Sequence, residues 1–257
     1  IVKMLLNIDK TDVNTYAPEN GNTPLMIAIE SKHVEIAKLL INDQRTNINI
    51  RNYDNQTALT FASRKKLIEI IDLLISNEKF DPEESSLNFA FFISNNEIAS
   101  KLFNLKDLDV NYVAIDNDID HRLNISNSIY YTDRNKLYET ALTLATSKSD
   151  FYMVNLIVNH HSFNPITSQL KKAIFNCVEK QNFKMFEILI KLPYVDINMA
   201  TPTMSLLTCS AISKSREIMN AILAHPNFDP IKSSIYDTFI KCATKIDEQN
   251  NRVVRPI

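Results

Sequence analysis

The chain has 257 residues, and its 28 Lys and Arg residues against 30 Asp and Glu residues give a formal net charge of −2 at pH 7. This balance argues against nucleic acid as a partner, because phosphate binding usually needs a clear basic excess. The single glycine is Gly21. Phosphate loops, dinucleotide-binding turns and nucleophile elbows all depend on glycine, so the composition argues against enzymes of those classes.

The sequence also bears on localisation. No apolar run approaches the roughly 20 residues that a membrane helix needs, and the apolar run at residues 1–6 is too short for a signal peptide. Three cysteines is an odd number for a disulfide framework. We expect an intracellular, cytoplasmic protein without membrane insertion, and the missing initiating Met leads us to expect a segment of a longer chain.

The predicted elements are short amphipathic helices that come in pairs. Residues 1–8 form the second helix of a first, partial pair. Thr23-Pro24-Leu25-Met26-Ile27-Ala28 recurs 34 residues later at 57–62 and returns at 140–145. A second amphipathic run follows each block, at residues 34–40, 68–74 and 151–157. Because helices of about eight to ten residues are marginal alone, each pair needs its neighbours and the pairs must stack.

Each pair ends in one of two ways. Asp-Val/Ile-Asn or a close variant ends at Asn14, Asn49, Asn111 and Asn198, and Phe-Asp/Asn-Pro ends at Pro82, Pro165 and Pro230. From Asn14 the steps between these ends are 35, 33, 29, 54, 33 and 32 residues. Five steps lie near 33 and one is longer by about 20, which predicts a repeat with one insertion.

The sequence from Gly21 to Ala28, followed by Val34 and Leu39-Leu40, resembles the ankyrin repeat, with Met26 where that family usually has His. Residues 57–82 and 140–165 resemble it too, and residues 86–111, 170–198 and 206–230 fit by spacing. The resemblance implies an all-α solenoid of stacked two-helix ankyrin-type repeats with one insertion. We therefore expect ankyrin repeats at 1–111, the first of them partial, an insertion loop at 112–139, and degenerate ankyrin repeats at 140–257, the last of them partial.

Two positions of the repeat carry a specific prediction. The glycine usual between the two helices is replaced by Ser31-Lys32, Arg64-Lys65 or Ser147-Lys148, where Ser and Lys serve with some strain. On the first helix, a small residue lets neighbouring first helices approach, and a larger one would overpack the stack. The predicted small residues are Ala28, Ala62, Ala90, Ala145, Cys177, Ala211 and Ala243.

The insertion at 112–139 contains four tyrosines and acidic turns around Asp116, Asp118 and Asp120. Insertions in repeat arrays usually emerge as a loop on one face, often the binding face. This segment is either a protruding loop that contacts a partner through tyrosines, or a loop that only packs on its neighbour. The sequence leaves both interpretations open.

Candidate metal sites fail on their spacing. Residues 116–120 resemble the opening of a calcium loop, but His121 stands where Gly is required and Asn127 stands where the bidentate Glu is required. His160 and His161 have no carboxylate or Cys at metal-ligand spacing. We expect no metal and no cofactor.

Catalytic chemistry is not indicated either. Cys177, Cys209 and Cys242 are 32 and 33 residues apart, which is the repeat period, so we interpret them as small buried side chains too far apart for disulfides. No local signature of a catalytic triad is present. We expect that the chain is not an enzyme.

The resemblance implies that partners bind to the concave side, which carries the first helices and the turn tips. Tyr53 is the most probable hot spot, because aromatic anchors dominate interfaces. The predicted partner-binding residues are Glu19, Asn20, Asn22, Glu30, Ser31, Tyr53, Asp54, Gln56, Arg64, Lys65, Lys136, Glu139 and Lys148, together with Tyr130 and Tyr131 of the insertion.

These observations predict a monomeric protein–protein interaction module or scaffold that binds a protein partner and catalyses nothing. The alternative is a regulatory or targeting array attached to an enzyme that lies outside these residues. The partner's identity does not follow from the sequence, because repeat scaffolds bind through surface side chains without a common code.

Overall fold

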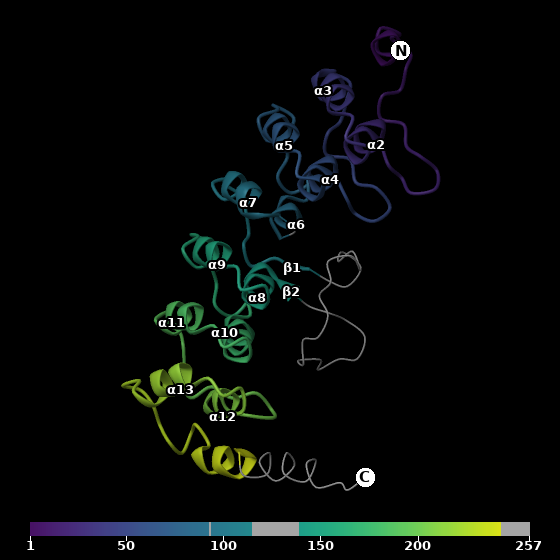
Figure 1. Cartoon of the computed structure of the whole chain (residues 1–257). Helices are drawn as coiled ribbons and strands as arrows, with labels where there is room; N and C mark the ends of the chain where they lie inside the picture. Colours follow the sequence, from purple (N-terminus) through teal and green to yellow (C-terminus); the bar gives the residue numbers. More distant parts are fainter. Residues whose placement is uncertain (93, 115–138, 243–257) are drawn as a thin grey trace, which may run out of the picture. The chain divides into compact units, whose positions relative to one another are not determined.

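The computed structural model describes residues 1–92, 94–114 and 139–242 (Figure 1). In these residues the regular structure is helical apart from one pair of two-residue strands. The chain divides into two compact units. The first comprises Ile1–Ala141 and Leu156–Phe163, and the second comprises Leu142–Asn155 and Asn164–Ile257. Each unit consists of stacked helix pairs, which confirms the predicted all-α repeat architecture.

The first unit holds its helices in two layers. In one layer α2 packs on α4 and α4 on α6, and in the other α3 packs on α5. The elements are α1 (Val2–Leu6), α2 (Pro24–Glu30), α3 (Val34–Asn42), α4 (Ala58–Lys65), α5 (Ile68–Ile75), α6 (Leu87–Phe92), α7 (Asn96–Leu102), β1 (Val113–Ala114) and β2 (Glu139–Thr140). The apolar core lies between the layers, where Leu25, Ile29, Leu59 and Ile70 are fully buried.

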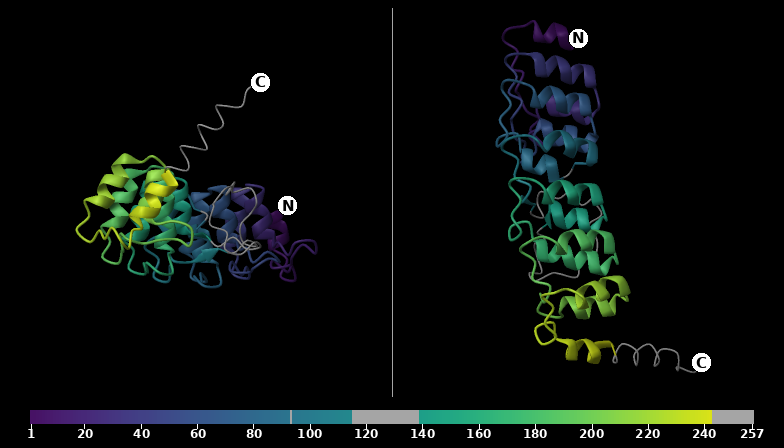
Figure 2. Two further views of the ribbon diagram at one scale, coloured as in Figure 1. Left: turned by 90° about the horizontal axis from the view of Figure 1, so that it is seen from below. Right: turned by 90° about the vertical axis from the view of Figure 1, so that its left-hand side faces the viewer.

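The second unit repeats this arrangement: α10 packs on α12, and α11 packs on α13. The loops before the first helices gather on one side of the helices in each unit (Figure 2). The remaining helices are α8 (Ala141–Ser147), α9 (Phe151–Val158), α10 (Leu170–Glu179), α11 (Phe183–Ile190), α12 (Leu206–Ile212) and α13 (Arg216–Leu223). Residues 235–242 are helical as well.

The first helices begin at hydroxyl caps. The side chains of Thr23, Thr57 and Ser205 accept hydrogen bonds from backbone N–H groups three residues on, at 3.3, 3.4 and 3.1 Å. Pro24 occupies the first position of α2, where the missing N–H has no helical partner anyway. Threonine caps are therefore present at the starts of α2 and α4.

In five helix pairs the turn between the two helices contains one left-handed residue, whereas the turn between α6 and α7 includes residue 93, which lies outside the described residues. The left-handed residues are Lys32, Lys66, Ser149, Gln181 and Lys214, with φ between 54° and 60°. None is glycine, although a left-handed conformation costs an ordinary residue roughly 1–2 kcal/mol. Lys32 belongs to the predicted pair Ser31-Lys32. In the next two turns that lack glycine, the predicted pairs Arg64-Lys65 and Ser147-Lys148 were wrong by one residue, since Lys66 and Ser149 take the left-handed conformation.

The next backbone N–H after each left-handed residue identifies the small position of the first helix. It donates to the carbonyl groups of Ala28, Ala62, Ala145, Cys177 and Ser210 in the successive turns. All five side chains are buried. The prediction of Ala211 was therefore wrong by one residue, since Ser210 faces the neighbouring helix and Ala211 is only half-buried. The side chain of Ala90 lies outside the described part of the structure, and so does the whole of Ala243.

Two kinds of loop precede the first helices, and we call the longer kind fingers. We call residues 14–23 the first finger and residues 49–57 the second finger. Each is closed by a backbone hydrogen bond of 2.9 Å, from Ala17 N–H to Asn22 O in the first and from Asn52 N–H to Gln56 O in the second. Figure 1 shows both as extended loops before α2 and α4.

A short turn replaces the finger before α6, before α10 and before the helix at 235–242. Each follows the sequence Asp/Asn-Pro-x-x-Ser-x-Leu/Ile, at 81–87, 164–170 and 229–235. The first side chain of the turn accepts two backbone N–H groups. The residue before the final Leu or Ile is left-handed, with φ from 52° to 57°. The Phe-Asp/Asn-Pro ends found in the sequence therefore mark short turns, and the ends at Asn14 and Asn49 mark fingers.

The asparagine at each Asn end joins consecutive repeats. Asn14, Asn49, Asn111 and Asn198 each donate from Nδ2 to a backbone carbonyl in the following repeat, at 2.8, 2.6, 2.5 and 2.8 Å. The Oδ1 atoms of Asn14, Asn49 and Asn198 accept a backbone N–H from that repeat as well. These amides satisfy loop groups that packing would otherwise bury without partners.

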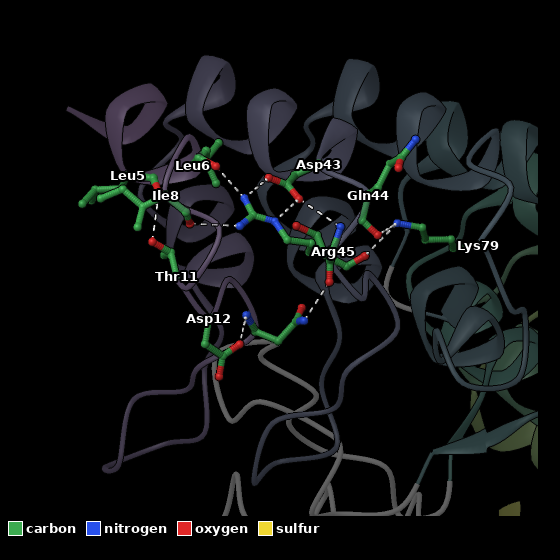
Figure 3. A network of polar contacts seen from close by, with 11 residues as sticks. Leu5, Leu6, Ile8, Thr11, Asp12, Asp43, Gln44, Arg45 and Lys79 are labelled. Atoms are coloured by element: carbon green, nitrogen blue, oxygen red, sulfur yellow. Dashed lines mark hydrogen bonds and ion pairs between the residues drawn. The ribbon is translucent and has the colours of Figure 1, made fainter.

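Cationic side chains close the ends of preceding repeats (Figure 3). The guanidinium of Arg45 donates to Leu6 O at 2.7 Å and to Ile8 O at 3.2 Å, where α1 ends. Asp43 holds this guanidinium at 2.7 Å, and the hydrogen bond from Arg45 lowers the pKa of Asp43 to about 2. Lys79 donates in the same way to carbonyl groups in the loop after α3. Such contacts satisfy carbonyls that a helix end leaves open.

Part of the predicted insertion can be placed. Val113 pairs with Thr140 and Ala114 with Glu139 in the antiparallel pair β1–β2, which brings the two sides of residues 115–138 together. Those residues lie outside the described part of the chain, as do the tyrosines predicted as partner contacts, Lys136, and the calcium-like sequence. These residues are Tyr130, Tyr131, Lys136 and 116–127.

Candidate partner-binding surface

The two fingers of the first unit present a pair of exposed tyrosines. Tyr53 has 63% of its surface exposed and Tyr16 has 61%. Their rings meet edge to face, with centroids 6.3 Å apart and an angle of 68° between planes. Exposed large aromatic side chains of this kind are the usual anchors of protein interfaces. Tyr53 was predicted as the main contact; Tyr16 was not.

Hydrogen bonds between the fingers hold this tyrosine pair in place. Tyr53 N–H donates to Asn20 O at 3.1 Å. Below it, Asn52 Nδ2 donates to Asn22 Oδ1 at 2.7 Å, in a buried position. The backbone under Tyr53 is therefore fixed before any partner arrives, which lowers the entropy lost on binding.

A groove lies beside the second finger, on the side of the short turn. Its cavity volume is about 680 Å³. The second finger, the short turn, the start of α6 and the loop before β1 all contribute residues to its lining. The lining residues are Arg51, Asn55, Asp81, Pro82, Glu83, Ser86, Leu87, Asn88, Asp107 and Tyr112.

The groove is acidic. Its lining includes the carboxylates Asp81, Glu83 and Asp107 and one cation, Arg51, which gives a formal charge of −2. The Arg51 guanidinium donates to the backbone carbonyl of Glu83 at 2.6 Å and to that of Glu84 at 3.1 Å. Arg51 thereby fastens the short turn to the second finger, and its charge lies against carbonyl oxygens.

The structure exposes some of the predicted contact residues fully and others in part. The side chains of Glu19, Glu30, Ser31, Tyr53, Asp54 and Lys148 are exposed. The side chains of Asn20, Gln56, Arg64 and Lys65 are half-buried. Whether any of them contacts a partner stays a prediction.

Two predicted contact residues are not accessible. Asn22 is only 5% exposed, because its amide points toward the second finger and binds Asn52. Glu139 is only 3% exposed, because it lies in β2 opposite Ala114. The expectation that these two side chains face solvent was wrong.

The accessible predicted residues form two groups. Glu19 and Asp54 lie on the fingers, which precede the first helices, whereas Glu30 and Arg64 lie where those helices end. A helix of seven residues such as α2 is about 10 Å long. The finger group and the helix-end group are therefore separate patches, and one small contact would not cover both.

Sequence reasoning missed Tyr16, Arg51 and the acidic groove. The available signal was the Phe-Asp-Pro end at Pro82, which leads directly into a helix and leaves no room for a finger. Each residue of the groove is ordinary in the sequence. Only the loss of the finger brings Glu83 and Asp107 into one groove.

Two of the three cysteines, Cys177 and Cys209, are buried. Burial raises the pKa of the Cys177 and Cys209 thiols to about 12, which keeps both sulfurs protonated and unreactive. Among residues 1–92, 94–114 and 139–242, no three His, Cys, Asp or Glu side chains are placed to share a metal ion. In the same residues no helix is long and apolar enough to cross a membrane.

Comparisons with known proteins bear on the first unit. Residues 1–86 match the family model for ankyrin repeats (3 copies). A search of curated proteins found no match. The matched region contains α1 to α5, both fingers and all but the last residue of the short turn at 81–87.

Proposed function

We propose that this chain binds a protein partner through its fingers and first helices, because residues 1–86 match the family model for ankyrin repeats, which are generally protein–protein interaction modules. In this proposal the chain is a monomeric, intracellular module that itself catalyses nothing. Its role is to hold a partner on a preformed surface.

The observation that supports this proposal most directly is the exposed pair Tyr16 and Tyr53. Large exposed aromatic rings lack the favourable free energy of burial, and they gain it when a partner covers them. Tyr53 also lies on a backbone fixed by the hydrogen bond to Asn20. We therefore assign Tyr53 as the main anchor, with Tyr16, Glu19 and Asp54 around it.

Affinity capture from lysate of the source cell tests the proposal. The bait is the full chain, and the variant is Tyr53→Ala. Truncating an interface hot spot costs at least about 2 kcal/mol, which is roughly a 30-fold loss of affinity. The matched control is Tyr194→Ala, because Tyr194 is 71% exposed but belongs to the second unit.

Loss of a retained protein with Tyr53→Ala, and its retention with Tyr194→Ala, supports the proposal. Equal retention by all three baits contradicts the assignment of Tyr53. A further bait lacking residues 116–137, with β1 and β2 intact, tests the predicted contacts at Tyr130, Tyr131 and Lys136. If the protein is retained by the other baits and lost only with this deletion, the binding role belongs to the deleted segment.

A further inference from the structure

The two fingers stack in a defined register. Gly21 and Asn55 are equivalent tip residues, since each is left-handed, with φ of 74° and 58°. Each donates its N–H to the residue that closes its finger, Ala17 and Asn52 respectively. Asn20, which accepts Tyr53 N–H from the second finger, therefore corresponds to Asp54 of the second finger.

In the described part of the chain, the carbonyl of Asp54 accepts no hydrogen bond from a neighbouring finger. The next loop in the stack is the short turn at 81–87, which replaces a finger. Thr57 Oγ1 binds Ser85 O at 2.6 Å and Ser86 Oγ donates to Asn55 O at 3.4 Å. Within the described residues no N–H donates to Asp54 O. A hydrogen-bonding edge that the first finger uses is thus open on the second.

The acidic groove lies beside the second finger, and its lining includes Asn55, the residue that follows Asp54. Its volume of about 680 Å³ falls within the range of about 300–1,000 Å³ typical of protein sites for small ligands. That space accommodates a few residues of an extended chain. The lining charge of −2, carried by Asp81, Glu83 and Asp107 against Arg51, disfavours phosphate groups and favours a cationic side chain.

We propose that the acidic groove binds an extended segment of a protein partner, in the place where a third finger would stack, and that this segment carries a Lys or Arg side chain. One backbone N–H of the segment donates to Asp54 O, as Tyr53 N–H donates to Asn20 O. The cationic side chain lies against Glu83 and Asp107. This mode is related to the addition of a strand to an open sheet edge. The inference rests on the proposed function and specifies the chemistry of the partner.

The experiment uses random eight-residue peptides displayed on phage, selected on the immobilised full chain. The test variant is the double substitution Glu83→Gln and Asp107→Asn, which removes two exposed charges without changing shape. The control is Glu78→Gln with Glu97→Gln, the same charge change at exposed positions outside the groove lining. Unchanged thermal unfolding of both variants shows that each is folded.

The expected result is enrichment of Lys and Arg in peptides selected by the wild-type chain and by the control, and at least a ten-fold weaker binding of those peptides to the test variant. An N-methyl scan of a selected peptide is expected to show one position where methylation weakens binding at least five-fold. Absence of basic enrichment, equal binding to test and control variants, or a flat N-methyl scan overturns the proposal.

The outcome is separable from that of the tyrosine test. Peptides that depend on Glu83 and Asp107 but are insensitive to Tyr53→Ala support the groove even when Tyr53 is not an anchor. A partner that depends on Tyr53 but binds the groove variant normally supports the proposed function and rejects the groove.

Discussion

A Cβ atom placed on Gly21 would lie 2.7 Å from Cδ1 of Tyr53 and 3.0 Å from the backbone nitrogen of Tyr53. The ring of the most exposed tyrosine on the fingers thus rests on the one residue of the chain that has no side chain. Gly21 is also left-handed, with φ of 74°. The single glycine supports the proposed anchor in two ways: it permits the finger turn, and it leaves room for the ring.

The first prediction is that Gly21→Ala loosens both fingers. The left-handed conformation costs Ala roughly 1–2 kcal/mol, and the clash with the Tyr53 backbone adds to it. We expect the backbone amides of the fingers to exchange faster with solvent deuterium, with local protection reduced by about 1–3 kcal/mol. Amide hydrogen exchange read by mass spectrometry measures this.

Asn55→Gly is the control for that prediction, since Asn55 is left-handed at the equivalent position with φ of 58°. Glycine there removes strain without creating a clash, so protection of the fingers is expected to stay constant or to rise. Equal exchange in Gly21→Ala and wild type would show that the contact with Tyr53 is not tight.

The second prediction concerns the glycine-free turns. Lys32, Lys66 and Lys214 are left-handed, with φ of 56°, 59° and 60°. We expect each Lys→Gly substitution to raise the free energy of unfolding by up to about 1 kcal/mol, because glycine adopts this conformation without the steric cost. Urea denaturation measures the change.

Lys65→Gly is the matched control, one residue before Lys66 and inside α4. There glycine is expected to lower the free energy of unfolding by roughly 0.5–1 kcal/mol. If the substitutions at 65 and 66 have the same sign, the strain argument fails.

The third prediction is that Asn49→Ala destabilises the chain more than Asn198→Ala. Asn49 is buried, with Nδ2 2.6 Å from Lys79 O and Oδ1 3.3 Å from Asp81 N. Its removal leaves these backbone groups without partners, at about 1–3 kcal/mol for each buried group. Asn198 makes the equivalent bonds in a half-exposed position where water substitutes. Urea denaturation of the two variants compares them, and a larger loss for Asn198→Ala would contradict this account.

The fourth prediction is a pH dependence that comes from His160. This side chain is buried, with Nε2 3.1 Å from Phe103 O and Nδ1 accepting Ser162 N–H at 3.2 Å. A ring that donates at Nε2 and accepts at Nδ1 is neutral. Burial, together with the neighbouring His161, lowers the pKa of His160 below its usual 6.5, against smaller opposing effects of the hydrogen bond to Phe103 O and of Asp109.

The unfolded chain therefore binds a proton at His160 below about pH 6.5 that the folded chain resists. Stability from this residue is complete above that pH and decreases as the pH falls, by at most about 1.4 kcal/mol per pH unit for one proton. We expect His160→Asn to flatten the dependence between pH 5 and 7, measured by urea denaturation. His33→Asn, at an exposed turn position, controls for loss of a histidine, and an unchanged slope in His160→Asn would refute the assignment.

The sequence was sufficient to predict the helix pairs, their starts and their repeat. Thr23 and Pro24 mark a helix start through local chemistry, since a hydroxyl cap and a proline act within one turn. The absence of glycine from the turns was visible in the sequence, but the left-handed residue after α4 is Lys66, one residue after the predicted pair Arg64-Lys65. The prediction failed by one residue at Ala211, where Ser210 takes the small position and the repeat has drifted from the ankyrin pattern.

The sequence by itself determined that this chain is a set of stacked helix pairs, because amphipathic spacing and caps act over a few residues and repeat every 33 or so. Tertiary structure decided which side chains face solvent. Asn22 and Glu139 are polar, yet hydrogen bonding between fingers and pairing of β1 with β2 bury them. The acidic groove likewise exists only because a short turn stands beside a finger, so that Glu83 and Asp107, 24 residues apart in the sequence, line one cavity.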